Sequence, residues 1–81
     1  MKILLVDDDV FLRDMYATKF TEQGDIVVGA ASGAEALQLV ESDFFDVVLL
    51  DMVMPGMSGI DILQAIKKID SAQKSKCIVL S

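Results

Sequence analysis

The strongest constraint on the fold of this chain is a regular alternation between short apolar runs and segments with helical spacing. The apolar runs occupy residues 3–6, 26–28, 47–50 and 78–80. Continuous apolar runs of this length are typical of strands that are covered on both faces. Strand and helix in alternation favour βαβ units, and right-handed crossovers then predict a doubly wound α/β fold with a parallel sheet.

Between the runs, apolar residues recur every three or four positions, as on one face of a helix. The first such segment carries four large ones, which we expect to face the core: Leu12, Met15, Tyr16 and Phe20. Polar residues mark the predicted helix starts. Asp9 is suited to cap the first helix, Ser32 and Glu35 have capping-box spacing before the second, and Ser58 precedes the third. Gly24 suits the left-handed residue after the first helix.

Composition limits the partners and the compartment. The chain of 81 residues is long enough for one domain, and no linker, repeat or low-complexity segment divides it. Its net charge of −6 argues against direct binding to nucleic acid. A single cysteine, Cys77, permits no intrachain disulfide, and no apolar run is long enough for a membrane span or a signal peptide. We therefore expect a cytoplasmic protein without membrane contact.

The only basic cluster in the sequence does not change this conclusion. It consists of Lys67, Lys68, Lys74 and Lys76. Lysines are mostly solvated at protein surfaces, so we interpret the cluster as an exposed helix end and loop.

Oxygen-bearing side chains follow three of the four predicted strands. Asp7, Asp8 and Asp9 follow the first, Asp51 the third and Ser81 the fourth. In doubly wound sheets the ligand site lies beyond the carboxyl ends of the strands, so these groups meet there if the first and third strands are adjacent. Clustered carboxylates repel unless a cation joins them, and Mg²⁺ prefers oxygen ligands. Because Asp can also form an aspartyl phosphate, the arrangement suggests a Mg²⁺-assisted phosphoryl site.

Each of these signals is weak when taken alone. Runs of Asp most often form solvated turns or helix caps, and an Asp after a strand is common. The joint arrangement at three strand ends carries the argument. For Asp9 we favour the helix cap, given its position before the periodic stretch.

Three segments resemble the receiver domain of bacterial response regulators. Residues 3–9, ILLVDDD, resemble its opening, and residues 77–81, CIVLS, resemble its fourth strand, which ends at a Ser/Thr position. Residues 47–59, VVLLDMVMPGMSG, resemble its phosphorylation segment almost letter for letter. The resemblance covers the whole chain. It implies a flavodoxin-like βαβαβαβ arrangement with strand order 2-1-3-4, and a signalling module rather than an enzyme.

The resemblance also implies roles for matching residues. Asp51 corresponds to the phosphoacceptor, which takes a phosphoryl group from a sensor histidine kinase. Asp7 and Asp8 correspond to the acidic pair that organises Mg²⁺, with Asp8 the favoured direct ligand. The backbone carbonyl of Val53 corresponds to a further metal ligand, and Ser81 to the switch hydroxyl.

The match stops before the end of the family's domain. A fourth helix, a fifth strand and a fifth helix are absent, so residues 1–81 correspond to the N-terminal part of a single receiver domain. The fifth strand carries the family's Lys and its aromatic switch residue, and no residue here takes either role. Lys76 precedes the fourth strand and is expected at the opposite end of the sheet. Without the Lys, we expect phosphorylation to be slower or absent, since phosphoryl transfer depends on charge neutralisation.

Two other classes of function compete with the signalling module. In the first, the chain is a truncated fragment that self-associates without phosphotransfer, as a homodimer or higher oligomer, because residues 78–80 form an uncharged apolar edge. In the second, it is a phosphatase with Asp7 as nucleophile and Asp9 as partner. That family expects a hydroxyl where Phe11 stands. A flavin-binding fold lacks support because no Gly/Ser/Thr phosphate loop follows the first strand.

Overall fold

Seven elements alternate along the chain. The computed structural model describes residues 1–51, 59–69 and 76–80, with side chains for residues 1–50 and 60–69. In chain order the elements are β1 (Lys2–Val6), α1 (Val10–Glu22), β2 (Ile26–Ala30), α2 (Gly33–Ser42), β3 (Val47–Asp51), α3 (Gly59–Ile69) and β4 (Lys76–Leu80). Every predicted apolar run lies inside a strand, so the predicted alternation is confirmed.

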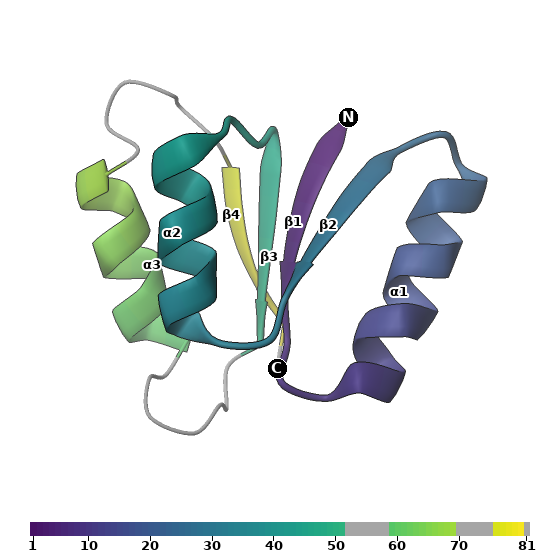
Figure 1. Ribbon diagram of the computed structural model, residues 1–81, viewed down its shortest axis with the longest axis horizontal. Coiled ribbons are helices and arrows are strands. Elements are labelled where there is room, and N and C mark those ends of the chain that lie inside the picture. Colours follow the sequence, from purple (N-terminus) through teal and green to yellow (C-terminus); the bar gives the residue numbers. More distant parts are fainter. Residues whose placement is uncertain (52–58, 70–75, 81) are drawn as a thin grey trace.

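The strands form one parallel sheet in the order β2-β1-β3-β4 (Figure 1). β1 lies between β2 and β3, with Leu5 beside Gly29 on one side and Leu49 on the other. The chain therefore runs from β1 to the edge strand β2, then crosses to the other side of β1 to form β3, and continues outward to β4. The predicted α/β class and strand order are confirmed.

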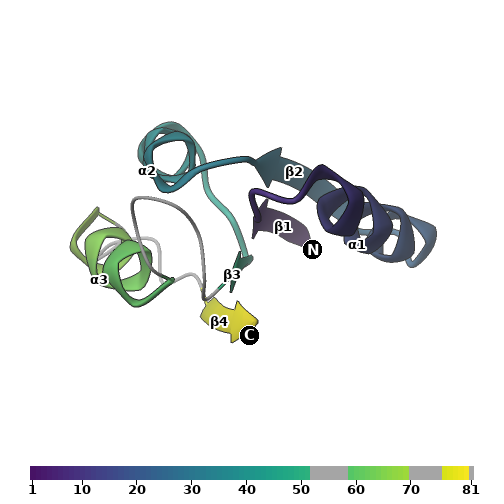
Figure 2. The ribbon, with the colours of Figure 1, turned by 90° about the horizontal axis from the view of Figure 1, so that it is seen from below.

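The helices cover the two faces of the sheet unequally. α2 and α3 lie on one face and α1 on the other (Figure 2). The larger core, between the sheet and α2 and α3, includes Leu4, Val6, Ala30, Ala36, Val40, Phe45, Val48, Leu50, Ile62 and Ile66. The smaller core contains Ile3, Leu5 and Leu49, packed against Tyr16 and Phe20 of α1. Successive residues of β1 thus enter opposite cores, which explains why its run is apolar without interruption.

The prediction that Leu12 and Met15 face the core is wrong. Leu12 is 40% exposed and Met15 is 49% exposed, and α1 contains no fully buried residue. Tyr16 and Phe20 do pack against the sheet. The apolar residues of α1 span a wider arc than the contact with the sheet covers, so helical spacing alone could not identify the half that stays in solvent.

The predicted caps are confirmed where the structure describes them. The Asp9 carboxylate accepts hydrogen bonds from the backbone N–H groups of the first turn of α1. The Ser32 hydroxyl accepts from the Glu35 N–H at 3.2 Å, as the capping-box spacing predicts. The Glu35 carboxylate accepts from the Ala31 N–H at 3.3 Å, one residue before the cap, and not from the Ser32 N–H of a strict capping box. Gly24 follows α1 with φ of 89°, a conformation that glycine adopts without strain. Ser58 lies outside the described residues.

At the amino ends of the strands, several interactions converge on Lys2. Its backbone N–H donates to Asp46 at 2.7 Å, its ammonium group pairs with Asp43, and its Nζ lies 5.3 Å from the Phe45 ring centroid. The hydrogen bond from Lys2, together with one from the Phe44 N–H, holds the pKa of Asp43 below its ordinary value. These contacts fix the loop between α2 and β3 at the edge opposite the predicted site.

Two further sequence expectations concern the molecular surface. No helix in the described ranges is long and apolar enough to cross a bilayer. β4 is an outermost strand of the sheet as described, and it pairs with β3. Self-association of the 81-residue polypeptide through this edge stays a prediction, and sedimentation equilibrium over a concentration series is the measurement that tests it.

Two neighbouring phenylalanines provide a stability test of this fold. Phe45 is 1% exposed, whereas Phe44 is 44% exposed. We expect Phe45→Ala to lower the free energy of unfolding by roughly 3–5 kcal/mol, because it removes buried area and leaves a cavity. Phe44→Ala should cost less than about 1 kcal/mol. Urea unfolding of the two variants measures the difference, and equal losses would contradict the core described above.

Candidate functional site

The carboxyl ends of β1, β2 and β3 lie at one edge of the sheet. Val6, the last residue of β1, pairs with Ala30 of β2 and with Leu50 of β3. Asp7 follows β1 directly, and Asp51 is the last residue of β3. Neighbouring strands run about 4.8 Å apart, so the backbones of these two acids reach the same edge on adjacent strands. The condition on which the predicted site depended, adjacency of the first and third strands, is met.

Asp7 is a buried acid held by several hydrogen bonds. It is 5% exposed. Its N–H donates to the Ala30 carbonyl at 3.0 Å, and its carboxylate accepts from the Asp9 N–H at 2.9 Å. Its carbonyl oxygen accepts from Arg13 Nη1 at 2.8 Å. A buried carboxylate needs such partners to remain in place, so Asp7 is a fixed point between β1 and α1.

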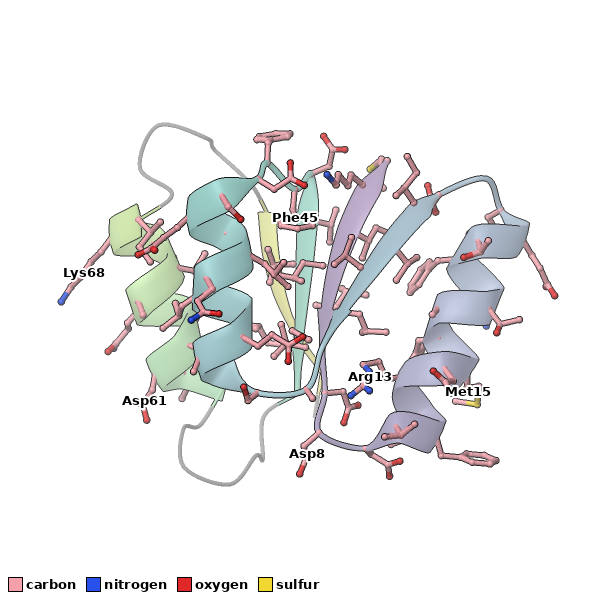
Figure 3. All side chains as sticks on the ribbon, viewed as in Figure 1. Asp8, Arg13, Met15, Phe45, Asp61 and Lys68 are labelled. Atoms are coloured by element: carbon pink, nitrogen blue, oxygen red, sulfur yellow. The ribbon has the colours of Figure 1, made fainter. Side chains whose placement is uncertain are left out.

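Asp8 and Asp9 differ from Asp7 because both are exposed. In Figure 3, Asp8 projects away from the sheet at the turn between β1 and α1. The Asp9 carboxylate Oδ1 accepts hydrogen bonds from the N–H groups of Phe11 and Leu12, at 2.9 and 3.3 Å. The assignment of Asp9 to a helix cap is confirmed, and Asp8 remains as the acid that a solvated cation can approach.

Part of the predicted site lies beyond the described side chains. The backbone of Asp51 is described and pairs with Leu80 of β4, but its carboxylate is not among the described side chains. Val53 and Ser81 lie outside the described residues. Their roles stay predictions.

The donor chemistry of this edge fits Mg²⁺. Among the described residues, no group of three His, Cys, Asp or Glu residues is placed to hold a metal ion. The predicted ligand Val53 lies outside those residues. Asp7 and Asp8 supply carboxylate oxygens at the strand end, and Asp51 belongs to the same edge. A set of oxygen donors alone is the kind that hard divalent cations prefer.

Two residues near this edge were missed from the sequence. Arg13 lies in α1, and side chains of a helix point toward its N-terminus, so an arginine near the helix start reaches back to the strand end. Gly29 is an isolated glycine inside a strand, which often marks the close approach of another group. Built on Gly29, a Cβ would lie 3.1 Å from Arg13 Cδ. These two general rules, applied together, could have found the pair.

An apolar surface adjoins the same edge and was also unexpected. At the start of α1, Phe11 is 81% exposed and Val10 is 58% exposed, and Leu12 and Met15 of the same helix are exposed as well. Met15 lies on the outer side of the helix in Figure 3. We call these four residues the α1 surface.

Comparison with known proteins agrees with this fold. A family model described as the response regulator receiver domain matches residues 3–81. Sporulation initiation phosphotransferase F of Bacillus subtilis is 45% identical over 69 residues, which cover 85% of this chain and 56% of that protein. Chemotaxis protein CheY of Thermotoga maritima is 40% identical over 81 residues, which cover 99% of this chain and 66% of that protein.

Solved structures agree as well. Chemotaxis protein CheY4 of Vibrio cholerae superposes with a TM-score of 0.90 at 31% identity, over 96% of this chain and 65% of that one. Response regulator TrrA of Thermotoga maritima, solved in complex with Mg²⁺ and BeF, gives a TM-score of 0.87 at 35% identity over 96% of this chain and 66% of that one. The chain thus spans about two thirds or less of the length of these relatives. With the parallel sheet and the acidic edge, these matches establish that the chain belongs to the response regulator receiver domain family, the signalling modules of two-component systems, which are not catalytic enzymes.

Proposed function

We propose that Asp51 accepts a phosphoryl group from a phosphohistidine on a sensor kinase, with the help of Mg²⁺. The observation that carries the proposal is the parallel pairing of β1 with β3. β3 ends at Asp51, and the neighbouring strand β1 ends directly before Asp7. Receiver domains partner with histidine kinases, and this chain matches their family model over residues 3–81.

The transfer is a substitution at phosphorus. A carboxylate oxygen of Asp51 attacks the phosphorus, the P–N bond to the imidazole breaks, and the histidine nitrogen keeps the bonding electron pair and takes up a proton. An acyl phosphate forms on Asp51. Mg²⁺, when bound, offsets the negative charge of the phosphoryl oxygens.

The two acids at the end of β1 are proposed to contribute differently to Mg²⁺ binding. Asp7 is buried and hydrogen-bonded, so it provides a carboxylate of fixed position. Asp8 is exposed and is proposed as a direct ligand, together with Asp51 and the carbonyl of Val53. The family motif supports Val53 and supports Ser81 as the hydroxyl that meets the phosphoryl group. The Mg²⁺-BeF complex of TrrA supports the choice of ion.

The α1 surface is proposed to contact the kinase. Its residues Val10 and Phe11 directly follow the helix cap Asp9, so they adjoin the edge that carries Asp7 and Asp8. Exposed apolar side chains grouped beside a reactive edge are typical of protein contact sites. A kinase that delivers a phosphoryl group to Asp51 has to approach this edge.

A second candidate is that residues 1–81 alone do not complete phosphotransfer. We propose that these residues form the N-terminal part of a longer receiver domain, since the chain spans 56% and 66% of the lengths of the two curated relatives. The family's Lys, which neutralises phosphoryl charge, has no counterpart in the sequence given. The 81-residue polypeptide and the full-length parent, compared in the same assay, distinguish the two candidates.

The metal site can be tested without phosphorylation. Addition of millimolar Mg²⁺ should move the backbone NMR signals of Asp7, Asp8 and Asp51. Asp43 and Asp46, at the opposite edge, serve as internal controls and should not move. Asp8→Asn should weaken binding by roughly tenfold, because loss of a charge-assisted contact costs about 1.5 kcal/mol or more. Equal shifts at both edges would contradict the site.

The phosphoacceptor can be identified by intact mass. Acetyl phosphate should add one phosphoryl group to the full-length parent and none to Asp51→Asn, which keeps the shape of the side chain but lacks the nucleophilic oxygen. Asp14→Asn, a change at an exposed acid of α1, should retain the mass gain. A mass gain in Asp51→Asn equal to that of the parent would assign the phosphoryl group elsewhere.

The kinase contact can be separated from the chemistry by the choice of donor. With the fastest donor in a panel of phosphorylated sensor kinases, Phe11→Ala should slow transfer about fivefold or more, the cost of losing an aromatic interface contact. Acetyl phosphate should phosphorylate this variant at the parent rate. Phe44→Ala removes an exposed phenylalanine at the other edge and should alter neither rate. A similar slowing with both donors would argue against a docking role.

A further inference from the structure

Arg13 connects α1 to the end of β1 through a specific hydrogen bond. Its Nη1 donates to the Asp7 carbonyl oxygen at 2.8 Å in a partly buried setting. The two residues are six positions apart, and the turn that contains Asp8 and Asp9 lies between them. Figure 3 shows the Arg13 side chain extending from α1 toward the strand end above Asp8. The guanidinium group therefore forms a hydrogen bond across the turn that contains Asp8, a proposed metal ligand.

The path of the Arg13 side chain depends on a glycine in β2. A Cβ at Gly29 would lie 3.1 Å from Arg13 Cδ and 3.2 Å from Nε, closer than most real Cβ contacts. Gly29 pairs in register with Leu5, two residues before Asp7. β2 thus leaves room for the arginine beside the central strand, and a Cβ at position 29 would require the Arg13 side chain to shift by a few tenths of an ångström.

Arg13 also adds to the contacts that hold Asp7. The Asp7 N–H is bound by Ala30, its carboxylate by the Asp9 N–H, and its carbonyl by Arg13. We propose that Arg13, seated on Gly29, is a positioning residue that holds the β1–α1 turn so that Asp7 and Asp8 face Mg²⁺ in the orientation that binding requires. The inference rests on the proposed function, and it adds a residue that neither binds the ion nor touches the phosphoryl group.

A positioning role and a simple charge effect predict opposite results. If the guanidinium group acted only as a nearby positive charge, its removal would tighten the binding of a cation. If it holds the turn, its removal weakens binding, as is typical when a group behind a metal ligand is lost. High salt separates the two effects, because at about 0.5 M the Debye length is only about 4 Å and distant charges are screened.

The main test is Mg²⁺ affinity of Arg13→Met at low and high salt, measured by NMR titration. Methionine keeps an apolar stem over Gly29 but cannot donate the hydrogen bond. We expect binding to weaken about tenfold at high salt, and Arg13→Lys, which keeps a donor and the charge, to recover most of it. Ile66→Val, which trims a buried residue of the opposite core, is the control for lost stability and should bind Mg²⁺ normally.

A second readout needs no metal. Hydrogen exchange of the Asp9 amide, which donates to the Asp7 carboxylate, should be faster in Arg13→Met than in Ile66→Val at matched urea stability. Gly29→Ala should weaken Mg²⁺ binding in the otherwise unchanged chain and have no further effect in an Arg13→Ala background, where the Arg13 atoms nearest to the new methyl group are absent.

Unchanged or tighter Mg²⁺ binding by Arg13→Met at high salt, with unchanged Asp9 exchange, would overturn the inference. Independent effects of Gly29→Ala and Arg13→Ala would overturn it as well, even if Arg13→Met failed to fold. Failure of the parent to bind Mg²⁺ would instead contradict the metal site of the proposed function. The Asp9 exchange rate would then still decide whether Arg13 holds the turn.

Discussion

The parallel pairing of β1 with β2 on one side and β3 on the other is the interaction on which the structure depends. It places β1 inside the sheet, where helices cover both of its faces, so Leu4 and Val6 enter one core while Ile3 and Leu5 enter the other. It also fixes the point at which three strands end. The acids that follow have no freedom to lie elsewhere, because a shift by one residue would exchange the two cores.

Burial and function meet at the end of this central strand. Asp7 is the one buried polar residue of the part whose side chains are described. Its carboxylate accepts from the Asp9 N–H, and its carbonyl accepts from Arg13. Asp8, one residue later, is exposed. The turn therefore offers one acid of fixed geometry and one that a hydrated ion can reach. Membership of the receiver family also removes the phosphatase reading of Asp7, because receivers are signalling modules and not enzymes.

Sequence reasoning worked where one strong pattern governs the structure and failed where two surfaces compete. The continuous run at residues 3–6 was enough to predict a doubly covered strand, and the acid after it pointed to the strand end where the site is proposed. Leu12 and Met15 were assigned to the core wrongly, since periodicity does not reveal how wide a strip of α1 the sheet covers. Arg13 and Gly29 escaped notice because the rule for residues at a helix start and the rule for glycines inside strands each apply to one segment, and the pair emerges only when the two are combined.

The central claim is that Asp51 and the β1 acids form one phosphoryl and Mg²⁺ site. A crystal structure of the full-length parent with Mg²⁺ and beryllofluoride, which mimics a phosphoryl group, tests it most directly. The account predicts beryllium bonded to an Asp51 carboxylate oxygen and Mg²⁺ about 2.1 Å from oxygens of Asp8 and Asp51. Beryllofluoride bound to another acid, or Mg²⁺ bound away from the carboxyl ends of β1 and β3, would contradict it.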